Sequence, residues 1–163
     1  MATLPDKALT GHIISFLESI GIRVAIEHLA DDTLLPAMTV RDGGLVVDPE
    51  RLEWPGDLLH EAGHIAVTDP AERASLNLVS SEPGEEIAAI CWSYAASVAI
   101  GLDPTVVFHD DGYKGGGGYL AENFTAGRYV GLPLLQWYGM TLDDKNAAAQ
   151  GAEPYPRMQR WLR

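Results

Sequence analysis

Hydrophobic residues recur at helical spacing over residues 6–20, and short segments rich in β-branched residues follow. The first pattern predicts an amphipathic helix, and a glycine stands directly after it, where helices commonly end. Segments 22–29, 37–41 and 44–48 predict three short strands. The Asp42-Gly43 pair between the last two favours a tight hairpin turn, because glycine accepts a positive φ. A helix followed by a small sheet is therefore expected.

Two further helices are predicted downstream of the strands. Residues 58–66 carry apolar side chains on one face, with Asp57 as the expected N-cap and Asp69-Pro70 as the end. Pro83-Gly84 then introduces a longer, largely apolar helix that closes at Gly101. Two glutamates fall in the first turn of this helix, where the helix dipole favours acidic side chains.

The last third of the chain has weaker patterns. Residues 109–118 are polar and glycine-rich and predict a loop, and residues 157–163 form a small basic amphipathic tail. Short helical segments are expected over 119–126, 132–139 and 142–150. Because the sequence shows no internal repeat and no long linker, residues 1–163 are predicted to form one α+β domain.

Composition and charge narrow the function classes. The chain is 47% hydrophobic and 21% charged, which is typical of a globular protein. Its formal charge of −12 disfavours nucleic acid and anionic membrane surfaces as partners. The longest uncharged run, 87–102, is shorter than the about 20 residues that span a bilayer. With one cysteine and no convincing leader segment, the protein is expected to be cytoplasmic; the sequence leaves its oligomeric state open.

Residues 60–64 read His-Glu-Ala-Gly-His inside the predicted 58–66 helix. Positions four apart lie on one helix face, close enough for His60 and His64 to bind one zinc ion (Zn²⁺). Glu61 lies about 100° around the helix, where it can reach a water on the metal and act as a general base. The alternative is two exposed histidines beside a solvated glutamate. Gly63 is costly inside a helix, so a close packing partner is expected there.

A catalytic zinc site with an open position needs a third protein ligand. Glu86 is the preferred candidate, because the polar Ser93 and Ser97 continue its face along an otherwise apolar helix. Glu85 is the second candidate. A surface acid that interacts with the helix dipole is the alternative for either glutamate.

The HEAGH segment, the strands before it and the glutamates after it resemble the compact gluzincin metallopeptidases, the minigluzincins that include ImmA/IrrE-like peptidases. The resemblance covers about residues 22 to 100. It implies a zincin-like fold, in which a small mixed sheet of about three strands packs against the HExxH helix and a following glutamate-bearing helix. It also implies zinc held by His60, His64 and Glu86, and Glu61 as the base.

Other polar residues receive weaker assignments. His109, Asp110 and Asp111 could supply a rival ligand, but a loop surface is the preferred interpretation. The glycine run 115–118 lacks the features of a phosphate-binding loop, and a rim beside the site and a plain surface loop are equally compatible with it. The remaining assignments are structural roles for His12 and His28, a core position for Cys91, and core or interface positions for Trp92, Trp137, Tyr138 and Trp161.

Hydrolysis of a peptide bond usually uses an additional hydrogen-bond donor that stabilises the transition state. The candidates are Tyr94, Tyr113, Tyr119 and Tyr129, and the sequence does not distinguish them. Taken together, the sequence predicts a zinc metallopeptidase that cleaves a peptide or protein substrate by metal-activated water. The alternative hypothesis is a non-catalytic zinc-binding or regulatory module with the same fold.

Overall fold

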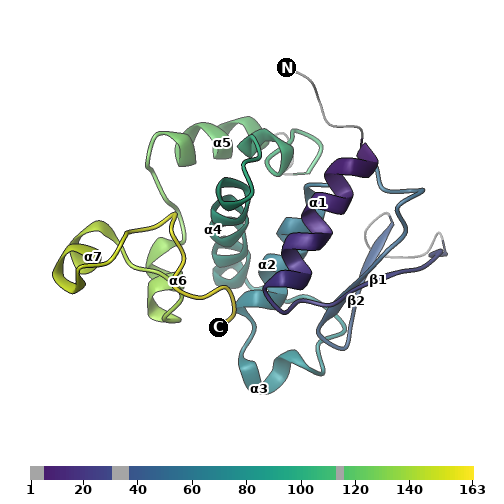
Figure 1. Cartoon of the computed structure of the whole chain (residues 1–163), viewed down its shortest axis with the longest axis horizontal. Coiled ribbons are helices and arrows are strands. Elements are labelled where there is room, and N and C mark those ends of the chain that lie inside the picture. Colours follow the sequence, from purple (N-terminus) through teal and green to yellow (C-terminus); the bar gives the residue numbers. More distant parts are fainter. Residues whose placement is uncertain (1–5, 31–36, 113–115) are drawn as a thin grey trace.

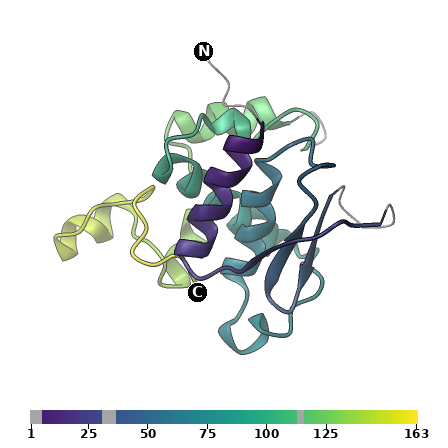
Figure 2. The same ribbon diagram turned by 45° about the vertical axis from the view of Figure 1, so that its right-hand side comes forward.

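A computed structural model describes residues 6–30, 37–112 and 116–163 of the chain. It has a mixed α+β architecture with a small three-stranded sheet, as predicted. In Figure 1, α4 (Pro83–Ala99) stands near the centre, with α2 (Asp57–Val67) between it and the sheet. Figure 2 shows α1 (Asp6–Ser19) lying beside α2.

The sheet consists of β1 (Val24–Ile26), β2 (Met38–Arg41) and β3 (Gly44–Val47) in the order β1-β3-β2. β3 pairs parallel with β1 and antiparallel with β2, so β2 is an edge strand. The predicted hairpin turn is confirmed: Asp42 and Gly43 have φ values of 48° and 74°. A positive φ at both central positions matches the right-handed twist of the strands.

The first predicted strand is shorter than the 22–29 segment from which it was expected. After Ile26, the amide of Leu29 donates to the carboxylate of Asp48, and His28 pairs with the same carboxylate at 3.0 Å. The chain therefore leaves the sheet to satisfy a buried acid.

The elements after the sheet broadly follow the expected order. They are α3 (Pro70–Arg73), the 3₁₀ helix η1 (Pro104–Val106), α5 (Gly117–Thr125), α6 (Leu132–Trp137) and α7 (Asp144–Gln150). The glycine run is not wholly a loop, because α5 begins at Gly117; Gly115 lies outside the described residues. The 157–163 tail is irregular. The Trp161 carbonyl accepts a hydrogen bond from the Trp92 indole, and the Trp161 ring lies edge-on to the Trp92 ring. No helix in the described ranges is long and apolar enough to cross a membrane.

Helices α2 and α4 pack closely at Gly63. A Cβ atom at this position would lie 2.7 Å from the carbonyl oxygen of Ala89 and 3.2 Å from its Cα atom. The packing partner expected from the sequence is therefore the backbone of α4. This close approach brings the first turn of α4 beside the histidine-bearing face of α2, where both helices carry polar residues.

We expect Gly63→Ala to destabilise the fold by about 1–3 kcal/mol, because the new methyl group forces the two backbones apart. Gly11→Ala in α1 is the matched control: an added Cβ there meets no atom within 4 Å, so the better helix propensity of alanine should stabilise by about 0.5–1 kcal/mol. Urea denaturation measures both changes. Equal effects of the two substitutions would contradict the packing argument.

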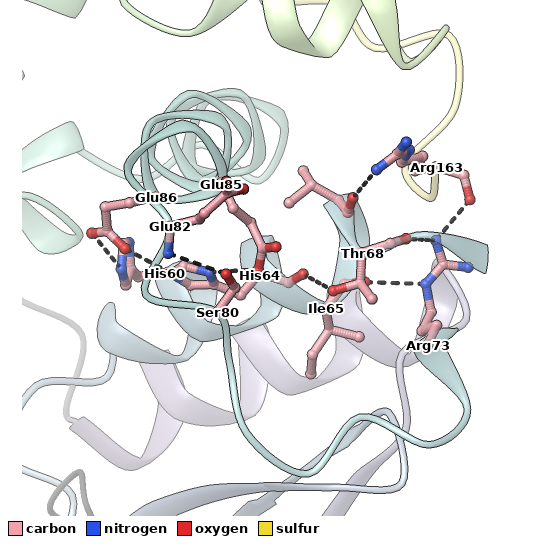
Figure 3. Close-up of polar contacts among 11 residues, drawn as sticks. His60, His64, Ile65, Thr68, Arg73, Ser80, Glu82, Glu85, Glu86 and Arg163 are labelled. Carbon is pink, nitrogen blue, oxygen red and sulfur yellow. Dashed lines mark hydrogen bonds and ion pairs between the residues drawn. The ribbon is translucent and has the colours of Figure 1, made fainter. Parts of the chain in front are cut away.

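The ends of α2 are held by contacts that differ from those expected. Asp57 is not the N-cap: Gly56 occupies that position without a side-chain cap, and Asp57 is the first helical residue. At the other end, the Arg73 guanidinium donates to the carbonyl oxygens of Ile65, Ala66 and Thr68. Figure 3 shows this cation beside Arg163, which donates to the Val67 carbonyl. These bonds satisfy carbonyl groups that a helix end leaves free.

Candidate metal centre

The side chains of His60, His64 and Glu86 converge where α2 and α4 face each other. The Nε2 atom of His60 lies 3.2 Å from Oε1 of Glu86, and the Nε2 atom of His64 lies 2.8 Å from Oε2. Figure 3 shows both imidazoles directed at this carboxylate. One ligand atom from each residue falls within 4.8 Å of the other two. The structure therefore brings together the three predicted ligands.

The position of Glu85 separates the two candidate third ligands. Its Oε1 atom lies 3.2 Å from Nδ1 of His64, on the side of the imidazole opposite the nitrogen that faces Glu86. Glu85 is thus neither a member of the three-residue group nor a free surface acid. A carboxylate on the second nitrogen of a metal-binding histidine fixes the tautomer and the orientation of the ring. Glu85 fits that supporting role.

Glu61 lies on α2 next to His60 but outside the ligand group, as expected for a general base. It is 6% exposed. Burial raises the pKa of its carboxyl group, and the neighbouring histidines His60 and His64 oppose this rise. A buried carboxylate with a raised pKa beside candidate metal ligands is a candidate functional group.

Hydrogen bonding couples the charges of the three candidate ligands. Contacts with His60 and then His64 hold the pKa of Glu86 well below its usual range, although burial opposes this. Burial disfavours the protonated form of His64, but its hydrogen bonds to Glu86 and Glu85 outweigh that effect and raise the pKa of the imidazole. The site therefore favours a negatively charged Glu86 carboxylate between two imidazole nitrogens that could each bind a metal ion.

This donor set fits a divalent metal ion. Two imidazole nitrogens and one carboxylate form a recognised ligand set for catalytic zinc, which keeps a further position open for water or substrate. Within residues 6–30, 37–112 and 116–163, the group contains no fourth protein ligand. A purely structural zinc site would usually have four.

We expect Glu85→Ala to weaken zinc binding by about 10- to 100-fold, because His64 loses the partner that orients its ring. Glu85→Gln should cost less, since the amide oxygen can still accept a hydrogen bond from Nδ1. The matched control is Glu82→Gln, which removes an exposed negative charge one turn earlier. Competition with a chromophoric chelator measures the dissociation constant. If Glu82→Gln and Glu85→Ala had the same effect, overall charge and not this contact would set the affinity.

His109 is neither a metal ligand nor a surface loop residue, and its expected surface position was wrong. The ring is buried and stacks on Trp54 with ring centroids 4.4 Å apart. Its Nε2 atom lies 2.6 Å from Oδ1 of Asp57, whereas its Nδ1 atom is buried without a hydrogen-bond partner. This contact ties the loop after η1 to the first turn of the histidine-bearing helix. The neighbouring Asp110 and Asp111 are exposed, as expected.

The tyrosine candidates for transition-state stabilisation have other surroundings. Tyr94 is buried and contacts Phe124 and Tyr129, with ring centroids 4.9 Å and 6.1 Å away. Tyr119 is 71% exposed, and Tyr113 lies outside the described residues. The structure therefore assigns this role to none of them.

Two polar residues used to favour Glu86 have a local role instead. The hydroxyl groups of Ser93 and Ser97 are buried and donate to carbonyl oxygens of their own helix, those of Ile90 and Tyr94. Cys91 is fully buried, as expected, and burial raises the pKa of its thiol to about 12.

Neither the Asp57–His109 pair nor the contact of Glu85 with Nδ1 of His64 was expected from the sequence. Asp57 and His109 are far apart in the sequence, and no periodic pattern links them. The distance between the side chains of His64 and Glu85 likewise depends on how α2 and α4 cross.

No protein-family profile, curated protein or solved structure matches this chain.

Proposed function

We propose that this protein is a metal-dependent hydrolase in which His60, His64 and Glu86 hold a zinc ion. The main support is the convergence of both Nε2 atoms on the two oxygens of one carboxylate, at 3.2 Å and 2.8 Å. More narrowly, we propose a zinc metallopeptidase of the compact gluzincin type, with a zincin-like fold. The HExxH segment and the glutamate on the following helix support this narrower proposal.

A bound zinc ion would supply a Lewis acid and lower the pKa of a water molecule. Glu61 is the residue of this chain that takes the proton from the attacking water and returns it to the leaving amine. Its burial limits competition from solvent, and its raised pKa makes it a stronger acceptor of that proton. Glu85 holds the ring of His64 in place during these steps.

An extended polypeptide is the substrate class that fits this surface. In the antiparallel pair of β2 and β3, the amide of Asp48 donates to the carbonyl of Ala37, and Arg41 pairs with Gly44. Because hydrogen-bonded positions alternate along a strand, the main-chain groups of Met38 and Val40 point away from β3. An added peptide strand can pair with such an edge.

We further propose a cytoplasmic protein with a single domain.

The alternative is a module that binds zinc and a partner without cleaving it. One observation favours this alternative: the cavity beside Glu61 measures only about 40 Å³. That volume holds a few water molecules but no peptide main chain.

A hydrolysis assay separates these proposals. The zinc-loaded chain is incubated with an unfolded protein and with a quenched-fluorescence peptide library, and Glu61→Gln serves as the matched inactive variant. Cleavage by the unchanged protein alone supports the peptidase. Binding of the same peptides by both proteins, with cleavage by neither, supports the non-catalytic module.

A further inference from the structure

The connection between α3 and α4 forms one wall of the cavity beside Glu61. This cavity is lined by Met38, Thr39 and Val40 of β2, by Glu61 of α2, and by Asn77, Leu78 and Val79 of the connection. We call residues 77–81 the strap. The edge of β2, which pairs with no further strand among the described residues, and the strap thus face each other across a narrow gap with the proposed general base between them.

The strap is fixed to the β2–β3 turn at its first residue. The side-chain oxygen of Asn77 accepts a hydrogen bond from the Asp42 amide at 3.0 Å, and its nitrogen donates to the Ser75 carbonyl at 3.1 Å. The same nitrogen lies 3.4 Å from the Asp42 carboxylate. Directly before the strap, the Leu76 carbonyl accepts from the Gly43 amide at 2.9 Å. We call these contacts the clasp.

Beyond the clasp, the main chain of the strap is held weakly. In the described part of the chain, no backbone hydrogen bond involves the main-chain groups of Leu78, Val79, Ser80 or Ser81. The side chain of Leu78 is also 69% exposed, so it adds little packing. Figure 3 shows the chain continuing from Ser80 through Glu82 into the first turn of α4, which carries Glu86. Val79 is the strap side chain that packs against the core. A segment with unpaired backbone and so little buried packing opens at low free-energy cost.

We propose that the strap is a gate that blocks the edge of β2 beside Glu61 until the clasp between Asn77 and Asp42 is released. In the closed state the gap of about 40 Å³ admits water and excludes a polypeptide. In the open state the main-chain groups of Met38 and Val40 become available to an incoming strand. The identity of the incoming group as a polypeptide rests on the proposed function. The opening of the strap does not depend on that function.

A thiol-labelling experiment measures the opening without metal or substrate. Val40 lines the gap and is 8% exposed, so Val40→Cys places a protected reporter there. Cys91 is fully buried and reacts only when the whole protein unfolds. The rate of reaction with a small aromatic disulfide is compared between Val40→Cys alone and Val40→Cys combined with Asn77→Ala, which removes the side-chain bonds of the clasp.

We expect Asn77→Ala to accelerate labelling of the reporter at least about 10-fold while Cys91 stays unreactive. The nearly isosteric Asn77→Asp is a second variant, and it should also accelerate labelling because it places a carboxylate beside that of Asp42. The matched control is Asn146→Ala, since Asn146 likewise donates from its amide to an aspartate, Asp143, but in α7. This control should leave the labelling rate unchanged.

Equal labelling rates with and without the clasp would overturn the gate. An acceleration accompanied by labelling of Cys91 would also overturn it, because global unfolding would then explain the exposure. The failure of the peptidase proposal has a different signature: the clasp variants label faster, but the zinc-loaded protein cleaves no peptide.

Discussion

Glu61→Gln is expected to abolish peptide hydrolysis and to leave zinc binding unchanged. Glutamine keeps the size of the side chain but cannot accept a proton from water, and loss of a general base typically costs about 10²- to 10⁴-fold in rate. Zinc binding should persist because Glu61 is not part of the His60, His64 and Glu86 group. The measurements are the turnover of a quenched-fluorescence peptide and the dissociation constant of zinc.

The control for this variant is Glu53→Gln, which neutralises an exposed acid shortly before α2. It should retain both activity and zinc affinity, so that a general charge effect is separated from the role of Glu61. A Glu61→Gln protein that still hydrolysed peptides at the unchanged rate would refute the assignment of the base.

The second large effect is expected for His60→Ala and His64→Ala, each of which should lose zinc. Each substitution removes one of three ligands, so the loss of affinity should exceed the about 10- to 100-fold typical of a residue that only orients a ligand. His64→Ala should have the larger effect on the metal-free fold as well. Its imidazole is buried between Glu85 and Glu86, and its removal takes one partner from each carboxylate and leaves Glu86 with His60.

Elemental analysis after gel filtration measures the bound zinc, and thermal unfolding measures the fold. The matched control is His28→Ala, because the side chain of His28 is 83% exposed and pairs with Asp48 away from the site. If His60→Ala and His64→Ala both retained stoichiometric zinc, the zinc would bind at a different site.

Local patterns in the sequence were informative about single elements. The 3.6-residue period placed α1 and α2, and the Asp42-Gly43 pair placed the hairpin, because both depend on interactions between residues close in the chain. Gly63 indicated a close packing partner, since glycine is otherwise unfavourable inside a helix. The identity of that partner, the backbone of Ala89, required the crossing of two helices.

Long-range pairing produced the differences. Asp57 looked like a helix cap, but its carboxylate bonds to His109, which lies far along the chain. The first strand ended early because Leu29 satisfies the buried carboxylate of Asp48. The choice between Glu85 and Glu86 also depended on tertiary geometry, since both residues occupy the same helical turn and their different rotations around it decide which nitrogen of His64 each meets.

The sequence alone determined that His60 and His64 share one helix face with Glu61 beside them, because helical geometry fixes the relative directions of neighbouring side chains. It could not determine that Glu86 closes the group, that Glu85 supports it, or that the strap narrows the gap at β2. Those arrangements depend on how α2, α4 and the sheet pack, and that packing is the sum of many weak contacts between residues distant in the chain.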